Sequence, residues 1–143
     1  MNYKIEINED QNEDIVILAK SKTAVLGKIE ELLCAEAETV IGYGENEALR
    51  LKSTEIYCFF IKDGKVLAQT RHGQLRIKER LYQLEEIFSK SFIKINQSCL
   101  INSQEIKSFS SSIGGTLFVT LKNGYKDYVA RRQLKQVKER LGI

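Results

Sequence analysis

The sequence predicts a mainly β fold, in which short antiparallel strands alternate with short helices and a small β-β-α segment comes first. Three observations carry this prediction. Many short runs of alternating or β-branched apolar residues follow one another at regular spacing. Two of the turns between them hold strong hairpin signals, Asp63-Gly64 and Asn123-Gly124. Only a few stretches show helical spacing, and they are far apart, so neither a doubly wound sheet nor a helix-turn-helix is expected.

Residues 1–38 are expected to form the β-β-α segment. Residues 3–7 alternate between apolar and polar side chains, and residues 15–19 are a β-branched apolar run. A helix is expected over residues 21–38, because apolar residues recur there every three or four positions. This segment is therefore a unit separate from the strands that follow it.

Residues 39–143 are expected to form a second, larger unit built mainly of strands. Alternation and β-branched residues mark the strands, while apolar residues at spacings of three and four mark two helices. Strands are expected at 39–44, 47–52, 55–61, 66–71, 74–77, 92–95, 99–101, 105–109, 115–122 and 125–130, and helices at 78–88 and 131–141. In the first helix, Ile77, Leu81, Leu84 and Phe88 are expected to face the core.

The charge of the chain is divided unevenly. Residues 1–48 hold 4 Lys and Arg against 11 Asp and Glu, a net charge of −7. Residues 49–143 hold 18 against 8, a net charge of +10. A basic part of this size indicates an anionic partner, although two solvated faces of opposite charge would give the same numbers.

No arrangement of residues supports catalysis, a metal site or a cofactor. Cys34, Cys58 and Cys99 are far apart among apolar neighbours, so they are expected to be reduced and buried. The single histidine, His72, leaves no zinc set, and Gly42-Tyr43-Gly44 lacks the third glycine of a dinucleotide loop. The protein is therefore not expected to be an enzyme. No signal peptide and no apolar run of about 18 residues is present, so a cytoplasmic protein is expected.

Basic and amide side chains gather at three turns or junctions of the expected strands. Loops on a rigid β scaffold can project side chains without disturbing the core. Asn and Gln can pair with adenine and Arg with guanine, while Lys and Ser can bind phosphates. Solvated turns explain the lysines better than ligand contact does, and explain the amide cluster equally well. The three groups are Lys62 with Lys65, the cluster Asn96, Gln97 and Ser98, and Arg131 with Arg132.

Two stretches resemble the LytTR DNA-binding domain of bacterial transcription regulators. They are FIKINQSCLINSQEIKSF (92–109) and LFVTLKNGYKDYVARRQLKQVKERLG (117–142). The family pattern has an apolar start, a basic residue, a polar cluster ending in Ser, an apolar triplet and an Asn, here Phe92, Lys94, 96–98, 99–101 and Asn102. The hairpin EIYCFFIKDGKVLAQT and the helix RLYQLEEIF also fit in order, so the resemblance covers about residues 39–143.

The resemblance implies elongated antiparallel β-sheets whose loops enter successive major grooves of DNA, with a pair of domains on a direct repeat. Carried over by position, the DNA-contacting loops are 62–65, 96–98, and Arg132 with Arg131 beside it. Two departures from the family pattern matter, at positions 60 and 97, and sequence preference or phosphate affinity at loop 96–98 is expected to differ from the family norm. Lys65 stands where the family often has His or Tyr, Phe60 where it often has Glu, and Gln97 where it often has Arg or Lys.

The resemblance also bears on residues 1–38. They are too few for the phosphoacceptor receiver that many family members carry, so the chain is similar to the stand-alone type, whose gene neighbour is often a small membrane protein that restrains the regulator. The expected function is a sequence-specific, dimeric transcription regulator, with residues 1–38 serving dimerisation or inhibitor docking. The alternative is a protein-interaction module whose basic part binds an acidic partner or a membrane surface.

Overall fold

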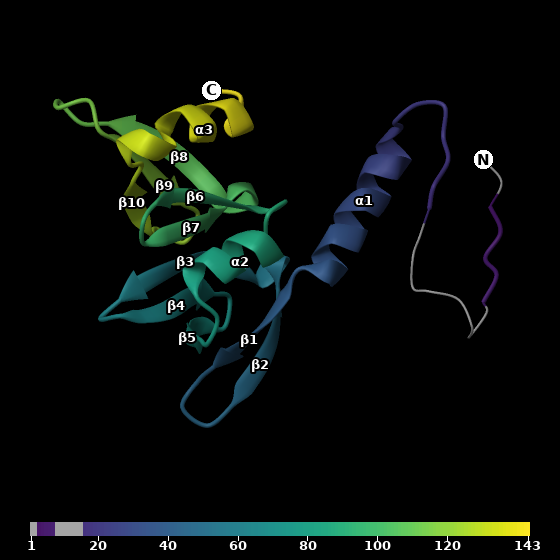
Figure 1. The fold of residues 1–143 in the computed structure, drawn as a ribbon, viewed down its shortest axis with the longest axis horizontal. Coiled ribbons are helices and arrows are strands. Elements are labelled where there is room, and N and C mark those ends of the chain that lie inside the picture. The colour runs from purple at the N-terminus through teal and green to yellow at the C-terminus, as the bar shows by residue number, and fades with distance from the viewer. Residues whose placement is uncertain (1–2, 8–15) are drawn as a thin grey trace.

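Two antiparallel β-sheets and three α-helices make up the part of the chain that the computed structural model describes, residues 3–7 and 16–143, with the backbone alone for 34–37 (Figure 1). The helices are α1 (Ala24–Ala37), α2 (Leu81–Ile87) and α3 (Arg131–Leu141). The strands are β1 (Thr39–Tyr43), β2 (Ala48–Lys52), β3 (Ile56–Lys62), β4 (Lys65–Thr70), β5 (Gly73–Ile77), β6 (Phe92–Asn96), β7 (Cys99–Asn102), β8 (Ile106–Ser111), β9 (Leu117–Leu121) and β10 (Lys126–Tyr128).

The strand order confirms the expected mainly β fold. Seven strands form one sheet in the order β2-β1-β5-β4-β3-β7-β6, and three form a second sheet in the order β10-β9-β8. The expected hairpin turn between β3 and β4 is present, with Lys62 opposite Lys65 and positive φ angles of 53° at Asp63 and 72° at Gly64. Two successive positive φ angles define the type I′ turn that suits the twist of a two-stranded hairpin.

The two strands expected at the N-terminus are not formed. Residues 3–7 and 16–19 have no strand assignment, and residues 8–15 lie outside the described part. The side chains of Tyr3 and Leu18 are 87% and 93% exposed, so these segments bury no apolar face within this chain. A two-stranded hairpin without such a face is marginal in water, which accounts for the failed prediction. The expected helix is present as α1, where Thr23 Oγ1 accepts a hydrogen bond from Leu26 N (3.3 Å).

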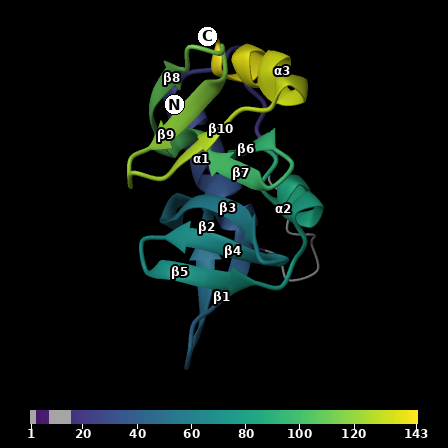
Figure 2. The ribbon, with the colours of Figure 1, turned by 90° about the vertical axis from the view of Figure 1, so that its left-hand side faces the viewer.

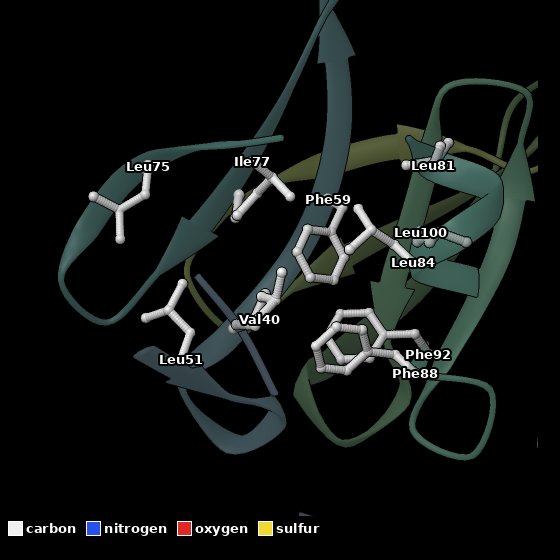
Figure 3. Close-up of a cluster of buried hydrophobic side chains, with 12 residues drawn as sticks. Val40, Leu51, Phe59, Leu75, Ile77, Leu81, Leu84, Phe88, Phe92 and Leu100 are labelled. Carbon is white, nitrogen blue, oxygen red and sulfur yellow. The ribbon is translucent and has the colours of Figure 1, made fainter. Parts of the chain in front are cut away.

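The first core lies between the large sheet and α2 (Figure 3). Its centre is a group of three aromatic rings, Phe59, Phe88 and Phe92, whose centroids are 5.1–5.2 Å apart. The four side chains expected to line the inner face of α2 are all buried, which confirms that prediction. The remaining members of this core are Val40, Leu51, Ile56, Ala68, Leu75, Ile77, Leu81, Leu84 and Leu100.

The second core joins the two sheets and α3. Cys58 on β3 and Cys99 on β7 pack in it with Val119 on β9 and Val137 on α3. Cys58 and Cys99 are free and buried, as expected, while the side chain of Cys34 lies outside the described residues. Burial raises the pKa of the Cys58 thiol to about 12. Both thiols therefore act as small apolar groups rather than as nucleophiles. In the described part of the chain, no helix is long and apolar enough to cross a membrane.

A single residue, Glu38, connects α1 to β1. Its side chain is only 3% exposed, and its carboxylate accepts hydrogen bonds from Ser91 Oγ and from Lys90 N (3.2 Å). Its carbonyl oxygen also accepts a hydrogen bond from Ser53 N (3.2 Å). The end of α1 is therefore fixed to the large sheet and to the turn between α2 and β6.

Candidate DNA-binding surface

Loop 1, residues 62–65, lies at the tip of the β3–β4 hairpin. Lys62 and Lys65 are exposed, and they form no ion pair with any residue that the structure describes. Just before the loop, Ile61 N donates a hydrogen bond to Ser98 O (2.9 Å). Loop 1 is thus held beside the turn that connects β6 and β7.

Loop 2, residues 96–98, is that turn. Gln97 and Ser98 are exposed, as expected of residues that contact a ligand. Asn96 differs from the expectation, because its side chain is only 2% exposed and both polar atoms of its amide form hydrogen bonds inside the protein. Asn96 Nδ2 donates to Tyr128 O (2.9 Å), and Asn96 Oδ1 accepts from Ser98 N (2.8 Å). Asn96 therefore shapes loop 2 and ties it to the end of β10.

A β-bulge explains the inward orientation of Asn96. The pairing of β6 with β7 shifts register between Lys94 and Asn96, and Ile95 and Asn96 are both buried. A bulge places two residues opposite one, which interrupts the alternation of inward and outward side chains. The sequence pattern alone assumes an uninterrupted strand and so assigns Asn96 to the surface.

Loop 3, residues 129–132, connects β10 to α3. Ala130 N donates a hydrogen bond to Ile95 O (2.8 Å), which holds this junction against β6. Arg131 and Arg132 are the first two residues of α3, and both are exposed. No described residue forms an ion pair with either guanidinium. Loop 3 therefore presents two unneutralised cations next to loop 2.

Together the three loops occupy one side of the molecule. Ile61, which precedes loop 1, is hydrogen-bonded to Ser98 of loop 2. Ile95, which precedes loop 2, is bonded to Ala130 of loop 3, and Asn96 of loop 2 to Tyr128 at the end of β10. In Figure 2, which looks at the left-hand side of Figure 1, β10, β7, β3 and β4 follow one another from top to bottom. The sequence-predicted groups, which extend over 70 positions from Lys62 to Arg132, thus come together on one face, with Asn96 beneath it.

A group of polar contacts fixes the small sheet against the large one. Arg71, which follows β4, forms an ion pair with Glu105 (Nη2–Oε1, 2.7 Å) and donates to Tyr57 Oη (2.8 Å). Asn123 Nδ2 donates to Gln69 Oε1 (3.0 Å) across the same junction. These contacts set the position of loop 3 relative to loops 1 and 2. No local signal in the sequence reveals them, because they join residues 14 to 54 positions apart.

A hollow of about 290 Å³ adjoins loops 1 and 2. Arg80 and Lys94 bring two positive charges to it, and Glu85 brings one negative charge. Gln97 lines it from loop 2 and Ile61 from the end of β3. Lys94 is the basic residue of the family pattern, and here it extends the positive surface beside loop 2.

Exposed Lys, Arg, Gln and Ser side chains are the kinds that nucleic-acid-binding domains use to contact phosphates and bases. The comparison with protein families gives the particular class. Residues 46–142 match the LytTr DNA-binding domain, and the chain belongs to the LytTR DNA-binding domain family. The match starts within the β1–β2 connection, so β1 adds a strand before it in the same sheet.

Known proteins with similar sequences cover this chain from end to end. An uncharacterized HTH-type transcriptional regulator of Staphylococcus aureus (strain bovine RF122 / ET3-1) is 27% identical over 148 residues, covering 100% of this chain and 99% of the relative. A protein with the same description from strain NCTC 8325 / PS 47 is 26% identical with the same coverage. In the described part of this chain, five strands separate α2 from α3, so those two helices form no helix-turn-helix.

A solved structure shares the fold. It is the LytTr DNA-binding domain of a putative methyl-accepting/DNA response regulator from Bacillus cereus. It superposes with a TM-score of 0.69 at 20% sequence identity, covering 74% of this chain and 98% of that chain. The LytTR-like fold is thereby confirmed.

Proposed function

We propose that this chain is a sequence-specific transcription regulator that inserts loops 1, 2 and 3 into successive major grooves of a direct-repeat DNA site. The observation that carries the proposal is the set of backbone hydrogen bonds that joins three exposed, basic or amide-bearing loops into one face. Membership in a DNA-binding family supports DNA as the ligand. The description of the Staphylococcus aureus relatives as transcriptional regulators supports a role in transcription.

The proposal divides the loop residues into three roles. Arg132 reads a base, because a guanidinium can pair with guanine through two hydrogen bonds. Gln97 has an amide that can read adenine or bind a phosphate oxygen, and its exposed position serves either contact. Asn96 acts on DNA only through the shape of loop 2, since its amide is engaged inside the protein. Lys62, Lys65, Ser98 and Arg131 contact phosphates and fix the orientation of the domain.

A regulator of this kind would work as a dimer in the cytoplasm of a bacterium, with one domain on each repeat. As in the stand-alone type of the family, a small membrane protein encoded nearby would restrain it by engaging residues 1–38. No cofactor and no catalytic step is part of the proposal.

The test is the affinity of the full chain for DNA from upstream of its own operon, measured by fluorescence anisotropy against a scrambled duplex. We expect a preference for the operon DNA and an affinity that falls by about 10³-fold or more between ~50 and ~200 mM salt if six or more phosphates are contacted. Arg132→Ala should weaken specific binding by about 1–3 kcal/mol and relax the preference at one base pair.

Arg50→Ala is the matched control. Arg50 is an exposed arginine on β2, which forms the edge of the large sheet opposite to β6. Its substitution should leave the affinity for DNA unchanged. The regulator proposal fails if the wild-type protein shows no salt-sensitive preference for the operon DNA. If Arg132→Ala binds like Arg50→Ala, DNA binding stands but the role of loop 3 is wrong.

A further inference from the structure

Helix α1 turns its polar side toward its own domain. Gly27, Glu30 and Glu31 line a groove of about 960 Å³ together with Arg71 and Lys90 of the larger unit. A helix on the surface of a single globular unit normally buries its apolar side there. The apolar side of α1 must therefore be covered by something other than this domain.

The segment before α1 covers only part of that apolar side. Ile17 and Ala19 share a hollow of about 410 Å³ with Leu26, Ile29 and Leu33 of the helix. On the other edge of the same face, Val25 and Leu32 remain 53% and 69% exposed. The helix thus has one apolar edge against residues 17–19 and one open edge.

Exposed apolar side chains are concentrated in this part of the chain. Sixteen large apolar side chains are exposed in the described residues, and nine of them lie in residues 3–7 and 16–33. Scattered single residues of this kind are ordinary, whereas a concentration on one unit indicates an interaction surface. The nine are Tyr3, Ile5, Ile7, Val16, Ile17, Leu18, Val25, Leu32 and Leu33.

We infer that this N-terminal arm, meaning residues 3–7 and 16–37, is the surface on which a second copy of the chain packs. The inference rests on the proposed function, because it names the surface that joins the two copies of the proposed dimer. Burying a large apolar side chain removes on the order of 100 Å² from water, so nine of them approach the ~800 Å² per partner of a standard interface. Residues 3–7 and 16–19, which alternate or cluster like strands, gain in the dimer the apolar face that they lack in one chain.

The position of the arm is compatible with simultaneous DNA binding. In Figure 1, α1 lies on the right of the molecule and the β3–β4 turn, which is loop 1, lies on the left. Two copies that meet through their arms therefore leave loops 1, 2 and 3 open. Glu38 holds α1 in this direction through its hydrogen bonds to residues 90 and 91.

Charge makes the two interactions distinguishable. Residues 1–37, the segment that contains the arm, carry 4 basic and 8 acidic residues, a net charge of −4 in each copy, so the arms repel one another at low salt. Salt screens that repulsion and leaves apolar burial intact, so the dimer tightens as salt rises. DNA binding weakens as salt rises, because salt opposes the release of counterions from the DNA.

The experiment is sedimentation equilibrium of the full chain at low and high salt. We expect a dimer that tightens with salt in the wild-type protein, and a dimer dissociation constant raised at least about tenfold in Leu32→Lys and in Val25→Lys. Ile113→Lys is the matched control, because Ile113 is a fully exposed isoleucine on the β8–β9 turn and should dimerise like the wild type. Circular dichroism and binding to a single DNA repeat verify that each variant is folded.

The results separate this inference from the proposed function. A wild-type chain that stays monomeric at ~100 µM at both salt concentrations overturns the inference. This holds even if the arm binds the small membrane protein encoded nearby. Dimers of Leu32→Lys and Val25→Lys as tight as the wild type overturn it too. Suppose that the wild-type chain dimerises, that both variants weaken the dimer, and that the wild type shows no preference for the operon DNA. The arm is then the dimer surface, but the proposed function as a transcription regulator is wrong.

Discussion

The N-terminal arm and the larger unit, residues 39–143, use their apolar residues in opposite ways. In the larger unit, Phe59, Leu84 and Phe88 are 0% exposed and belong to a core that this unit forms by itself. In the arm, Leu18 and Leu32 are 93% and 69% exposed. Both parts are rich in Ile and Leu, so apolar content alone does not decide which part is stable in isolation. Stability depends on whether the chain itself supplies the second apolar surface.

The largest expected effect tests whether the larger unit is stabilised by its own core. Phe59→Ala removes the ring that contacts both Phe88 and Phe92, and should lower the free energy of unfolding by about 3–5 kcal/mol. Leu32→Ala in the arm removes a side chain that is already 69% exposed in one chain. At concentrations where the chain is monomeric, it should change the free energy of unfolding by less than about 0.5 kcal/mol.

Urea denaturation followed by circular dichroism measures both changes. Similar losses in the two variants, at a concentration where both are monomeric, would show that the arm belongs to the same cooperative unit as the core. The contrast between the two regions would then be wrong.

A smaller effect is expected from Asn96, which is buried but polar. Asn96→Ala leaves Tyr128 O and Ser98 N without their hydrogen-bond partner, and should lower the free energy of unfolding by about 1–3 kcal/mol. Affinity for operon DNA should fall as well, because loop 2 and the end of β10 lose their connection. Gln97→Ala, in the same loop but exposed, is the control and should weaken DNA binding without loss of stability. Equal stability of the two variants would contradict the internal role of Asn96.

Substitutions at two glycines should have effects of opposite sign, and the one in the arm should be the smaller. A Cβ at Gly42 in β1 would lie 2.7 Å from Leu51 Cδ1 and 2.9 Å from Leu75 Cδ1, so Gly42→Ala should destabilise the core by about 1–3 kcal/mol. A Cβ at Gly27 in α1 would meet nothing within 4 Å, so Gly27→Ala should stabilise the helix by about 0.5–1 kcal/mol. Thermal unfolding and the helical signal at 222 nm would show whether the signs differ.

Most of the larger unit could be predicted from the sequence, because its signals are local. Alternation gave the strands, and Asp63-Gly64 and Asn123-Gly124 marked hairpins whose partners are adjacent in the chain. The helical spacing that ends at Phe88 identified the buried side of α2. Each of these features depends on residues within a few positions of one another.

Other features depend on contacts that no local pattern encodes. The ion pair between Arg71 and Glu105 spans 34 positions, and the bulge that buries Asn96 depends on how β6 meets β7. The strands expected at 3–7 and 15–19 were wrong for a related reason. Alternation predicts a strand only where another surface is present to cover its apolar side, and one chain does not provide it here.

The short connection through Glu38 bears on operator geometry. With one residue between α1 and β1, and its carboxylate bound to the turn at residues 90 and 91, the arm has no flexible linker. In a dimer that forms through such arms, the DNA-binding loops of the two copies would lie at a fixed distance and rotation from one another. Inserting half a helical turn, about 5 base pairs, between the repeats would then place one repeat on the far side of the duplex, beyond the reach of its domain.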